Sequence, residues 1–210
     1  GRKKHAGDAI FEDVNNDGQL DSKDMKFMGY IRPDKVGGIV NSFKYKGLTV
    51  RVVMDWAMGH VIDNGFKGQI MGSSRNNNNA IKDAMTNSWQ SANDGTKYPK
   101  YTVQSDYDYQ YRNHMRWDNQ IGSSESGSTN NSLYFSKGDY LAFREVSLSY
   151  MLPSTWVRKI RLSGVEVFAG AYNIGYIKKY DGMFPEIYTG VDYGVYPRPR
   201  QYNMGVKINF

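Results

Sequence analysis

The sequence predicts an all-β protein, a transmembrane antiparallel β-barrel to which this chain supplies about the last five strands and long extracellular loops. Residues 201–210 alternate between apolar and polar side chains up to a terminal phenylalanine. In Leu48–Gly59, six apolar residues in strict alternation oppose a face that carries Arg51 and Asp55. The connections between predicted strands are alternately short and long. This combination is typical of barrels that span a membrane, whose strands turn one face to lipid and the other to a wet lumen.

The composition restricts the class of protein further. The chain has 210 residues and no cysteine, which excludes a disulfide scaffold and a thiolate metal site. The mean hydropathy is −0.66, and no run of about 18 apolar residues is present, so no transmembrane helix is expected. The net charge is +6, but the basic residues are scattered rather than gathered on one face. No nucleic-acid partner is therefore predicted.

Five segments are predicted to be strands: Val36–Lys46, Leu48–Gly59, Asp139–Leu152, Leu162–Asn173 and Gln201–Phe210. In the first, Asn41 interrupts an apolar face. The third is predicted to gather six apolar side chains on one face: Tyr140, Ala142, Val146, Leu148, Tyr150 and Leu152. Arg144 falls on that same face, and the alternation does not explain it. The fourth gathers Val165, Val167, Ala169 and Ala171, and the fifth gathers Tyr202, Met204, Val206, Ile208 and Phe210.

The lengths of the connections predict which strand ends lie outside the cell. Lys46-Gly47 and Pro153–Arg161 are short, whereas residues 60–137 and 175–200 are long. Membrane barrels have short periplasmic turns and long outer loops. If the chain ends in the periplasm, both long connections lie outside and both short ones inside. Residues 1–35 are then an extracellular segment, and residues 36–210 are the carboxy-terminal part of the barrel.

The end of the chain also carries a predicted assembly signal. Asn203, Gly205, Ile208 and Phe210 follow the pattern polar, glycine, apolar, aromatic. This pattern resembles the signal by which outer-membrane barrels are delivered to their insertion machinery, and a terminal aromatic residue suits the membrane interface. An ordinary edge strand would show the same alternation.

A metal site is predicted in the amino-terminal segment. Oxygen-bearing residues occupy loop positions 1, 3, 5, 7, 9 and 12, with Gly18 at position 6: Asp13, Asn15, Asp17, Gln19, Asp21 and Asp24. Hard oxygen ligands at this spacing suit Ca²⁺, with Gln19 binding through its carbonyl. Asp24 stands where glutamate is usual, so it binds with one oxygen or less tightly. An Asx-rich turn without metal is the alternative.

No catalytic constellation is recognised, and the protein is not expected to be an enzyme. The three histidines stand alone, and neither a Gly-x-Ser-x-Gly elbow nor a phosphate-binding glycine loop is present. A glycosidase would need paired carboxylates, but the candidate glutamates are isolated in the sequence: Glu125, Glu145, Glu166 and Glu186.

Six segments, in order, resemble the carboxy-terminal part of the SusC/RagA family of TonB-linked outer-membrane proteins of Bacteroidetes. They are Gly7-Asp8 with Phe11–Gly18, Val36–Gly38 with Phe43–Gly47, Trp89 with Tyr98-Pro99, Gly138–Pro153, Asn173 with Lys179–Glu186, and Tyr196–Arg200 with Phe210. Together they run over nearly the whole chain. The departures are Asn16 for a glycine, Met183 for an aromatic residue, and Ala171-Tyr172 before Asn173.

The resemblance implies a barrel of about 22 strands with an amino-terminal plug. It implies nutrient import of glycans or peptides beneath a SusD-like surface lipoprotein, with energy from TonB, in the bacterial outer membrane. Five strands cannot close such a barrel. The chain is therefore expected to be a fragment whose partners are the remainder of the barrel, its plug, the lipoprotein, TonB and outer-membrane lipid. The alternative function is a soluble, secreted calcium-binding adhesion or dockerin-like β module. Nothing in the sequence identifies the transported substrate.

Overall fold

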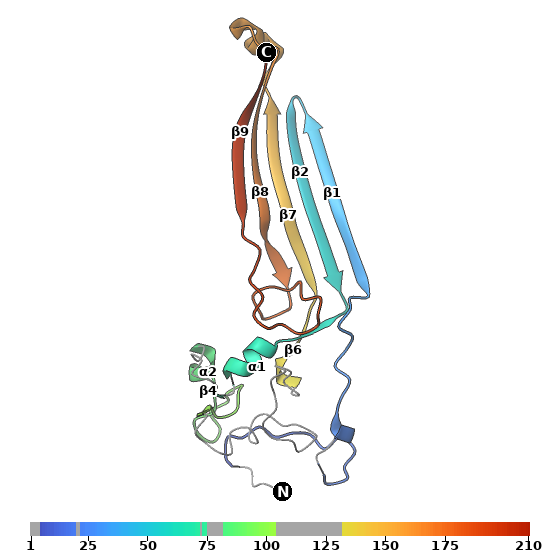
Figure 1. Cartoon of the computed structure of the whole chain (residues 1–210), viewed down its shortest axis with the longest axis vertical. Helices are drawn as coiled ribbons and strands as arrows, with labels where there is room; N and C mark the ends of the chain where they lie inside the picture. The colour runs from blue at the N-terminus through green and yellow to red at the C-terminus, as the bar shows by residue number, and fades with distance from the viewer. Residues whose placement is uncertain (1–4, 20–21, 72, 75–81, 104–131) are drawn as a thin grey trace. The chain divides into compact units, whose positions relative to one another are not determined.

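The computed structural model describes residues 5–19, 22–71, 73–74, 82–103 and 132–210 (Figure 1). Contacts along the chain divide it into two units. Unit 1 comprises Gly1–Ile31, Val61–Ser136 and Ile187–Val195, and unit 2 comprises Arg32–His60, Lys137–Glu186 and Tyr196–Phe210. Because each unit is assembled from separate stretches, the chain passes from one unit to the other several times.

Unit 2 is built on one five-stranded sheet, and Figure 1 shows its strands side by side. In spatial order the strands are β1 (Lys35–Tyr45), β2 (Leu48–Met58), β7 (Tyr140–Met151), β8 (Gly164–Lys178) and β9 (Gln201–Asn209). Every neighbouring pair is antiparallel. The five predicted strands are all present, and β8 runs five residues beyond its predicted end at Asn173. The antiparallel all-β architecture predicted from alternation is thus observed.

The short connections have the backbone geometry that tight turns require. Lys46 and Gly47, between β1 and β2, have φ angles of 45° and 86°, as a two-residue hairpin turn of the primed type needs. A Cβ atom on Gly47 would meet the backbone oxygen of Met151 at 2.7 Å, so glycine is required there for space as well. The β7–β8 connection contains the helical turns α4 (Ser154–Val157) and η4 (Arg158–Ile160).

Unit 1 contains short elements and a small, mostly aromatic core. They are η1 (Ser22–Asp24), β3 (Val61–Asp63), α1 (Gly65–Met71), β4 (Ser73–Ser74), α2 (Lys82–Thr86), β5 (Thr102–Val103), η3 (Ser132–Tyr134) and β6 (Phe135–Lys137). β3 pairs with β6, and β4 pairs in parallel with β5. Ala84, Tyr98 and Tyr134 are buried together, with Tyr101 and Leu133 against them. None of the helices in the described part of the chain has the length and hydropathy needed to cross a lipid bilayer.

The segment Ile187–Val195 belongs to unit 1 although both of its flanks belong to unit 2. Backbone hydrogen bonds hold it beside β3: Asp63 N donates to Gly190 O at 2.9 Å, and Asp192 N donates to Asp63 O at 2.8 Å. Phe66 N, in α1, donates to Asp192 O at 2.8 Å. The middle part of the long β8–β9 connection therefore belongs to unit 1, where it is hydrogen-bonded to β3 and α1.

Candidate functional site

The sheet of unit 2 has one apolar face, and the strand register shows it directly. A single row crosses all five strands through paired positions: Phe43, Val50, Leu148, Ala169 and Met204. Phe43, Leu148 and Met204 expose 59%, 47% and 88% of their side chains. Soluble proteins rarely leave so continuous an apolar surface uncovered. This face is the one on which the sequence places Leu48, Val50, Val52, Met54, Trp56 and Met58.

The opposite face of the sheet is polar. The neighbouring row reads Ser42, Arg51, Ser147, Gly170 and Asn203. The Nε atom of Arg51 lies 3.4 Å from a carboxylate oxygen of Glu145 on the next strand. The predicted alternation of β2 thus separates apolar side chains from charged ones.

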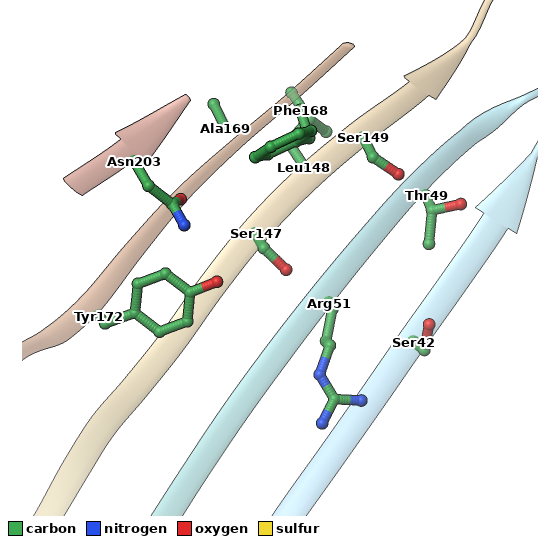
Figure 2. A pocket seen from close by; sticks show the side chains of 10 residues that line it. All are labelled: Ser42, Thr49, Arg51, Ser147, Leu148, Ser149, Phe168, Ala169, Tyr172 and Asn203. Atoms are coloured by element: carbon green, nitrogen blue, oxygen red, sulfur yellow. The ribbon is translucent and has the colours of Figure 1, made fainter. Parts of the chain in front are cut away.

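A shallow pocket of about 270 Å³ lies on the sheet of unit 2, and Figure 2 shows its lining. The lining residues are Ser42, Thr49, Arg51, Ser147, Leu148, Ser149, Phe168, Ala169, Tyr172 and Asn203. Hydroxyl groups, an amide and a guanidinium are gathered here beside the rings of Phe168 and Tyr172. Such a surface offers hydrogen bonds and aromatic faces to a polar ligand or to a packed polypeptide segment.

A bulge in β7 corrects one prediction from the sequence. Val53 pairs with Glu145 but Met54 pairs with Phe143, so Arg144 has no partner of its own across the ladder to β2. A bulge residue shifts the alternation by one position. Tyr140 and Ala142 therefore lie on the polar face opposite Ala57 and Asp55, and not with Val146 as predicted. The prediction of one shared face was wrong because it carried strict alternation through position 144.

The same bulge turns Arg144 toward the polar face, where it joins a charged cluster. Its Nη2 atom donates to Asp55 Oδ1 at 2.8 Å, and its Nε atom donates to Asp55 Oδ2. Its Nη1 atom lies 2.5 Å from Glu186 Oε1 and 3.2 Å from the Tyr176 hydroxyl oxygen. The fork of donors of a guanidinium suits such two-sided carboxylate contacts. We call Asp55, Arg144, Tyr176, Glu186 and Arg198 the Glu186 cluster.

Glu186 is the most enclosed member of this cluster, with 1% of its side chain exposed. It accepts a hydrogen bond from the Tyr176 hydroxyl at 2.6 Å, and its second oxygen lies 3.2 Å from Arg198 Nη2. The Tyr176 ring packs edge to face against the rings of Tyr140 and Phe184, with 5.9 Å between the ring centres in both pairs. The two carboxylates and two guanidinium groups balance in charge, which offsets part of the cost of burying them. No role was predicted for Glu186 from the sequence. The charged residues Asp55 and Arg144 inside predicted strands were the only sequence signals of the cluster.

A second polar junction lies where β2 ends and β7 begins. Gly59 N donates to Asp139 Oδ1 at 2.8 Å, and Lys179 Nζ donates to Asp139 Oδ2 at 3.0 Å. Gly138 N donates to the backbone oxygen of His60 at 2.8 Å, and a Cβ atom on Gly138 would collide with the His60 ring. The His60 side chain is buried, and its Nδ1 atom has no hydrogen-bond partner among the described residues.

The titration of both groups at this junction follows from burial and charge. Burial lowers the pKa of the His60 imidazole, because the charged form loses solvation, and the Asp139 carboxylate opposes this only in part. For Asp139 burial raises the pKa, but the hydrogen bond from Gly59 and the charge and hydrogen bond of Lys179 outweigh it. The pKa of Asp139 is therefore below its usual value.

The predicted calcium loop is a hydrogen-bonded curve of Asx turns. Asp13 Oδ2 accepts from Gly18 N at 2.8 Å, Asp17 Oδ1 accepts from Gln19 N at 2.8 Å, and Asp24 Oδ1 accepts from Val14 N at 2.8 Å. Gly18 has a φ of 78°, as the sharp turn at position 6 requires.

These bonds gather the side-chain oxygens of Asp13 and Asp17 and also fit a turn without metal. Asp21, a predicted ligand, lies outside the described residues. Among the residues that the structure describes, no group of three or more His, Asp or Glu side chains is close enough to hold a metal ion. The donor set of Asp13, Asn15, Asp17 and Gln19 fits Ca²⁺ chemically, and the site stays a prediction.

The four residues of the predicted assembly signal lie along β9 and at its end. Asn203 and Gly205 are on the polar face, opposite Gly170 and Phe168, while Ile208 is on the apolar face opposite Val165. A Cβ atom on Gly205 would meet the Phe168 ring at 2.6 Å. The ring therefore packs directly on the backbone of β9. Phe210 is 95% exposed, and its backbone oxygen accepts from Ser163 Oγ at 2.7 Å.

Comparisons with known proteins identify relatives along nearly the whole chain. The TonB-dependent receptor P3 of Formosa agariphila is 25% identical over 216 residues, which cover 97% of this chain and 19% of the receptor. The TonB-dependent receptor P39 of the same organism is 24% identical over 213 residues, with the same coverage. The TonB-dependent receptor SusC of Bacteroides thetaiotaomicron is 26% identical over 91 residues, 43% of this chain and 9% of SusC. No protein-family model matches the chain.

Solved structures share the fold. The RagAB peptide importer in an open-open state matches with a TM-score of 0.62 and 22% identity, over 88% of this chain and 18% of the importer chain. The same importer in a closed-closed state matches with a TM-score of 0.64 and 21% identity, over 92% and 20% of the two chains. At this identity the likeness establishes the fold alone.

Homologues of this chain are thus TonB-dependent receptors, SusC among them, and its structural neighbours are receptor barrels of that kind. The resemblance and the fold class predicted from the sequence are confirmed. TonB-dependent receptors such as SusC and RagA are outer-membrane proteins, which agrees with the predicted localisation. The relatives are receptors and importers rather than enzymes. The chain spans about a fifth of the length of the receptors P3 and P39.

Proposed function

We propose that this chain, whose homologues are TonB-dependent receptors, is part of an outer-membrane importer that takes up glycans or peptides. The observation that carries the proposal is the division of the five-stranded sheet into an uncovered apolar face and a charged face. β2 has 11 residues, about 36 Å at ~3.3 Å per residue, and a tilt of ~45° reduces this to about 25 Å. That height matches the apolar band of outer-membrane barrels.

The proposal assigns the two faces of the sheet to two environments. Lipid covers the row through Phe43, Val50 and Met204, which no other part of unit 2 covers. The row through Arg51 and Asn203 faces the interior, where water or a plug meets its polar groups. The rest of the barrel pairs with the outer strands β1 and β9. A soluble, secreted calcium-binding or dockerin-like module is not favoured, because its sheet would leave the apolar face in water.

The partners in this proposal are a SusD-like surface lipoprotein, TonB and outer-membrane lipid. The support for the lipoprotein comes from the structural neighbours, which are RagAB complexes. We also propose that Asp13, Asn15, Asp17, Gln19, Asp21 and Asp24 hold one Ca²⁺, which is supported by their spacing and by the hydrogen bonds that curve the loop.

Cell fractionation tests the proposal. The protein should sediment with outer membranes, resist extraction by high salt and alkali, and dissolve only in detergent. A detergent extract should contain it together with a surface lipoprotein. Deleting residues 76–101, which lie within the long connection 60–137 predicted to be outside the cell, should weaken that association while membrane insertion persists. Cells that lack the protein should lose uptake of labelled oligosaccharides or of labelled peptides. Release into the soluble fraction without detergent would contradict the proposal.

A further inference from the structure

Within the long connection between β8 and β9, an ion pair joins the two stretches that flank the segment Ile187–Val195. β8 ends at Lys178 and β9 begins at Gln201. Within this connection, Glu186 is the last residue of unit 2 before the chain enters unit 1, and Tyr196 is the first after it returns. Glu186 Oε2 lies 3.2 Å from Arg198 Nη2. The ion pair thus joins the outgoing and returning stretches of one excursion, Ile187–Val195.

Glu186, in the outgoing stretch, is held firmly to the sheet by hydrogen bonds and an ion pair. Glu186 contacts Arg144 Nη1 at 2.5 Å and the Tyr176 hydroxyl at 2.6 Å, and these residues belong to β7 and β8. Arg144 is itself held by two hydrogen bonds to Asp55 on β2. Four contacts on a carboxylate and a guanidinium that are mostly withdrawn from solvent leave Glu186 little freedom to move.

In the returning stretch, Arg198 supplies the contact to Glu186. Its guanidinium lies 5.9 Å from the centre of the Phe184 ring, and its side chain is half exposed. Asn173 Nδ2 donates to Pro199 O at 3.2 Å, which holds the neighbouring backbone to β8. Arg198 therefore reaches a carboxylate that is already positioned, and forming the pair does not require Glu186 to be reordered.

We propose that the Glu186–Arg198 pair is a neck clamp that closes the excursion Ile187–Val195 and keeps it ordered against unit 1. Glu186 is held to β7 and β8, and Pro199 to β8, by other contacts, so the pair adds its own energy to the closed excursion and does not shorten a free loop. An ion pair with one half-exposed partner contributes about 0.6 kcal/mol, a factor of about three in the closed population. The inference holds independently of the proposed import function, because it concerns chain closure alone.

The test is hydrogen exchange in the complete protein in detergent, with the variant Arg198→Ala. The amides of Asp63, Phe66 and Asp192 should exchange about threefold faster, while amides within β7, β8 and β9 keep their rates. Arg200→Ala is the matched control, since Arg200 lies two residues further on and forms no ion pair with the described residues. It should change neither set of amides.

Three outcomes would overturn the clamp. Unchanged exchange at Asp63, Phe66 and Asp192 in Arg198→Ala would show that Glu186 and Arg198 do not close the excursion. Faster exchange throughout β7 and β8 would show that Arg198 stabilises the sheet instead. Arg198→Lys keeps the charge and should restore part of the protection, so a loss as large as that of alanine would also contradict an electrostatic clamp.

Discussion

A charge placed on the apolar face of β2 tests the orientation of the sheet. Val52 lies near the middle of the strand and pairs with Asn41 and Val146 on the apolar face. With a strand that spans about 25 Å of membrane height, this position falls near the bilayer midplane. A lysine there costs about 2–4 kcal/mol in outer-membrane barrels. The lower figure already reduces the ratio of folded to unfolded protein about 30-fold.

Val53 provides the matched control because it differs by one position and by face. It pairs with Val40 and Glu145 on the polar side, so Val53→Lys meets a carboxylate and should cost far less. Leu48→Lys, at the strand end, should cost about 0–1 kcal/mol because the penalty falls toward the interface. Guanidinium unfolding in lipid vesicles, followed by tryptophan fluorescence, gives the three values. Equal costs for Val52→Lys and Val53→Lys would refute the assignment of the apolar face to lipid.

Three further predictions concern other parts of the chain. Arg144→Met should lower the unfolding free energy by up to about 3 kcal/mol in guanidinium titrations, because it strands the Asp55 carboxylate; Arg144→Lys should recover part of this, and an unchanged midpoint would contradict it. Stability should fall as pH drops below about 6.5, because burial lowers the folded-state pKa of His60, so the unfolded chain takes up the proton first. His60→Gln should flatten that pH profile of the unfolding midpoint, and a profile identical to wild type would show that another group is responsible. Millimolar calcium should raise the melting temperature of the wild type but not of Asp13→Asn, and calorimetry that detects no calcium binding to the wild type would exclude the site.

The strands could be predicted from the sequence because their information is local. β2 has six apolar residues at a spacing of two, and its predicted start at Leu48 is the observed one. The hairpin to β1 was predictable because only two residues separate the strands. The spacing of the calcium-type loop is local in the same way. Each of these features can be read within a dozen residues.

The charged cluster could not be predicted because it depends on contacts distant in sequence. Arg144 meets Asp55 across 89 positions, and the bulge that brings them together has no signal beyond a misplaced arginine. Glu186 looked isolated, yet its partners come from two strands and from the returning chain. The pairing of Val191 with Asp63 is equally non-local. Alternation gives no information on which loop segment returns to which element.

The bulge at Arg144 bears on how β7 tolerates changes in length. In an ordinary strand, adding one residue moves every later side chain to the opposite face. Here the bulge absorbs the extra residue: Phe143 pairs with Met54 and Val146 pairs with Val52, so both lie on the apolar face. If Arg144 were deleted, the remaining residues would read as an uninterrupted strand with the same apolar face. Arg144 is in effect an insertion, and one that adds a charge to the polar face without disturbing the apolar one.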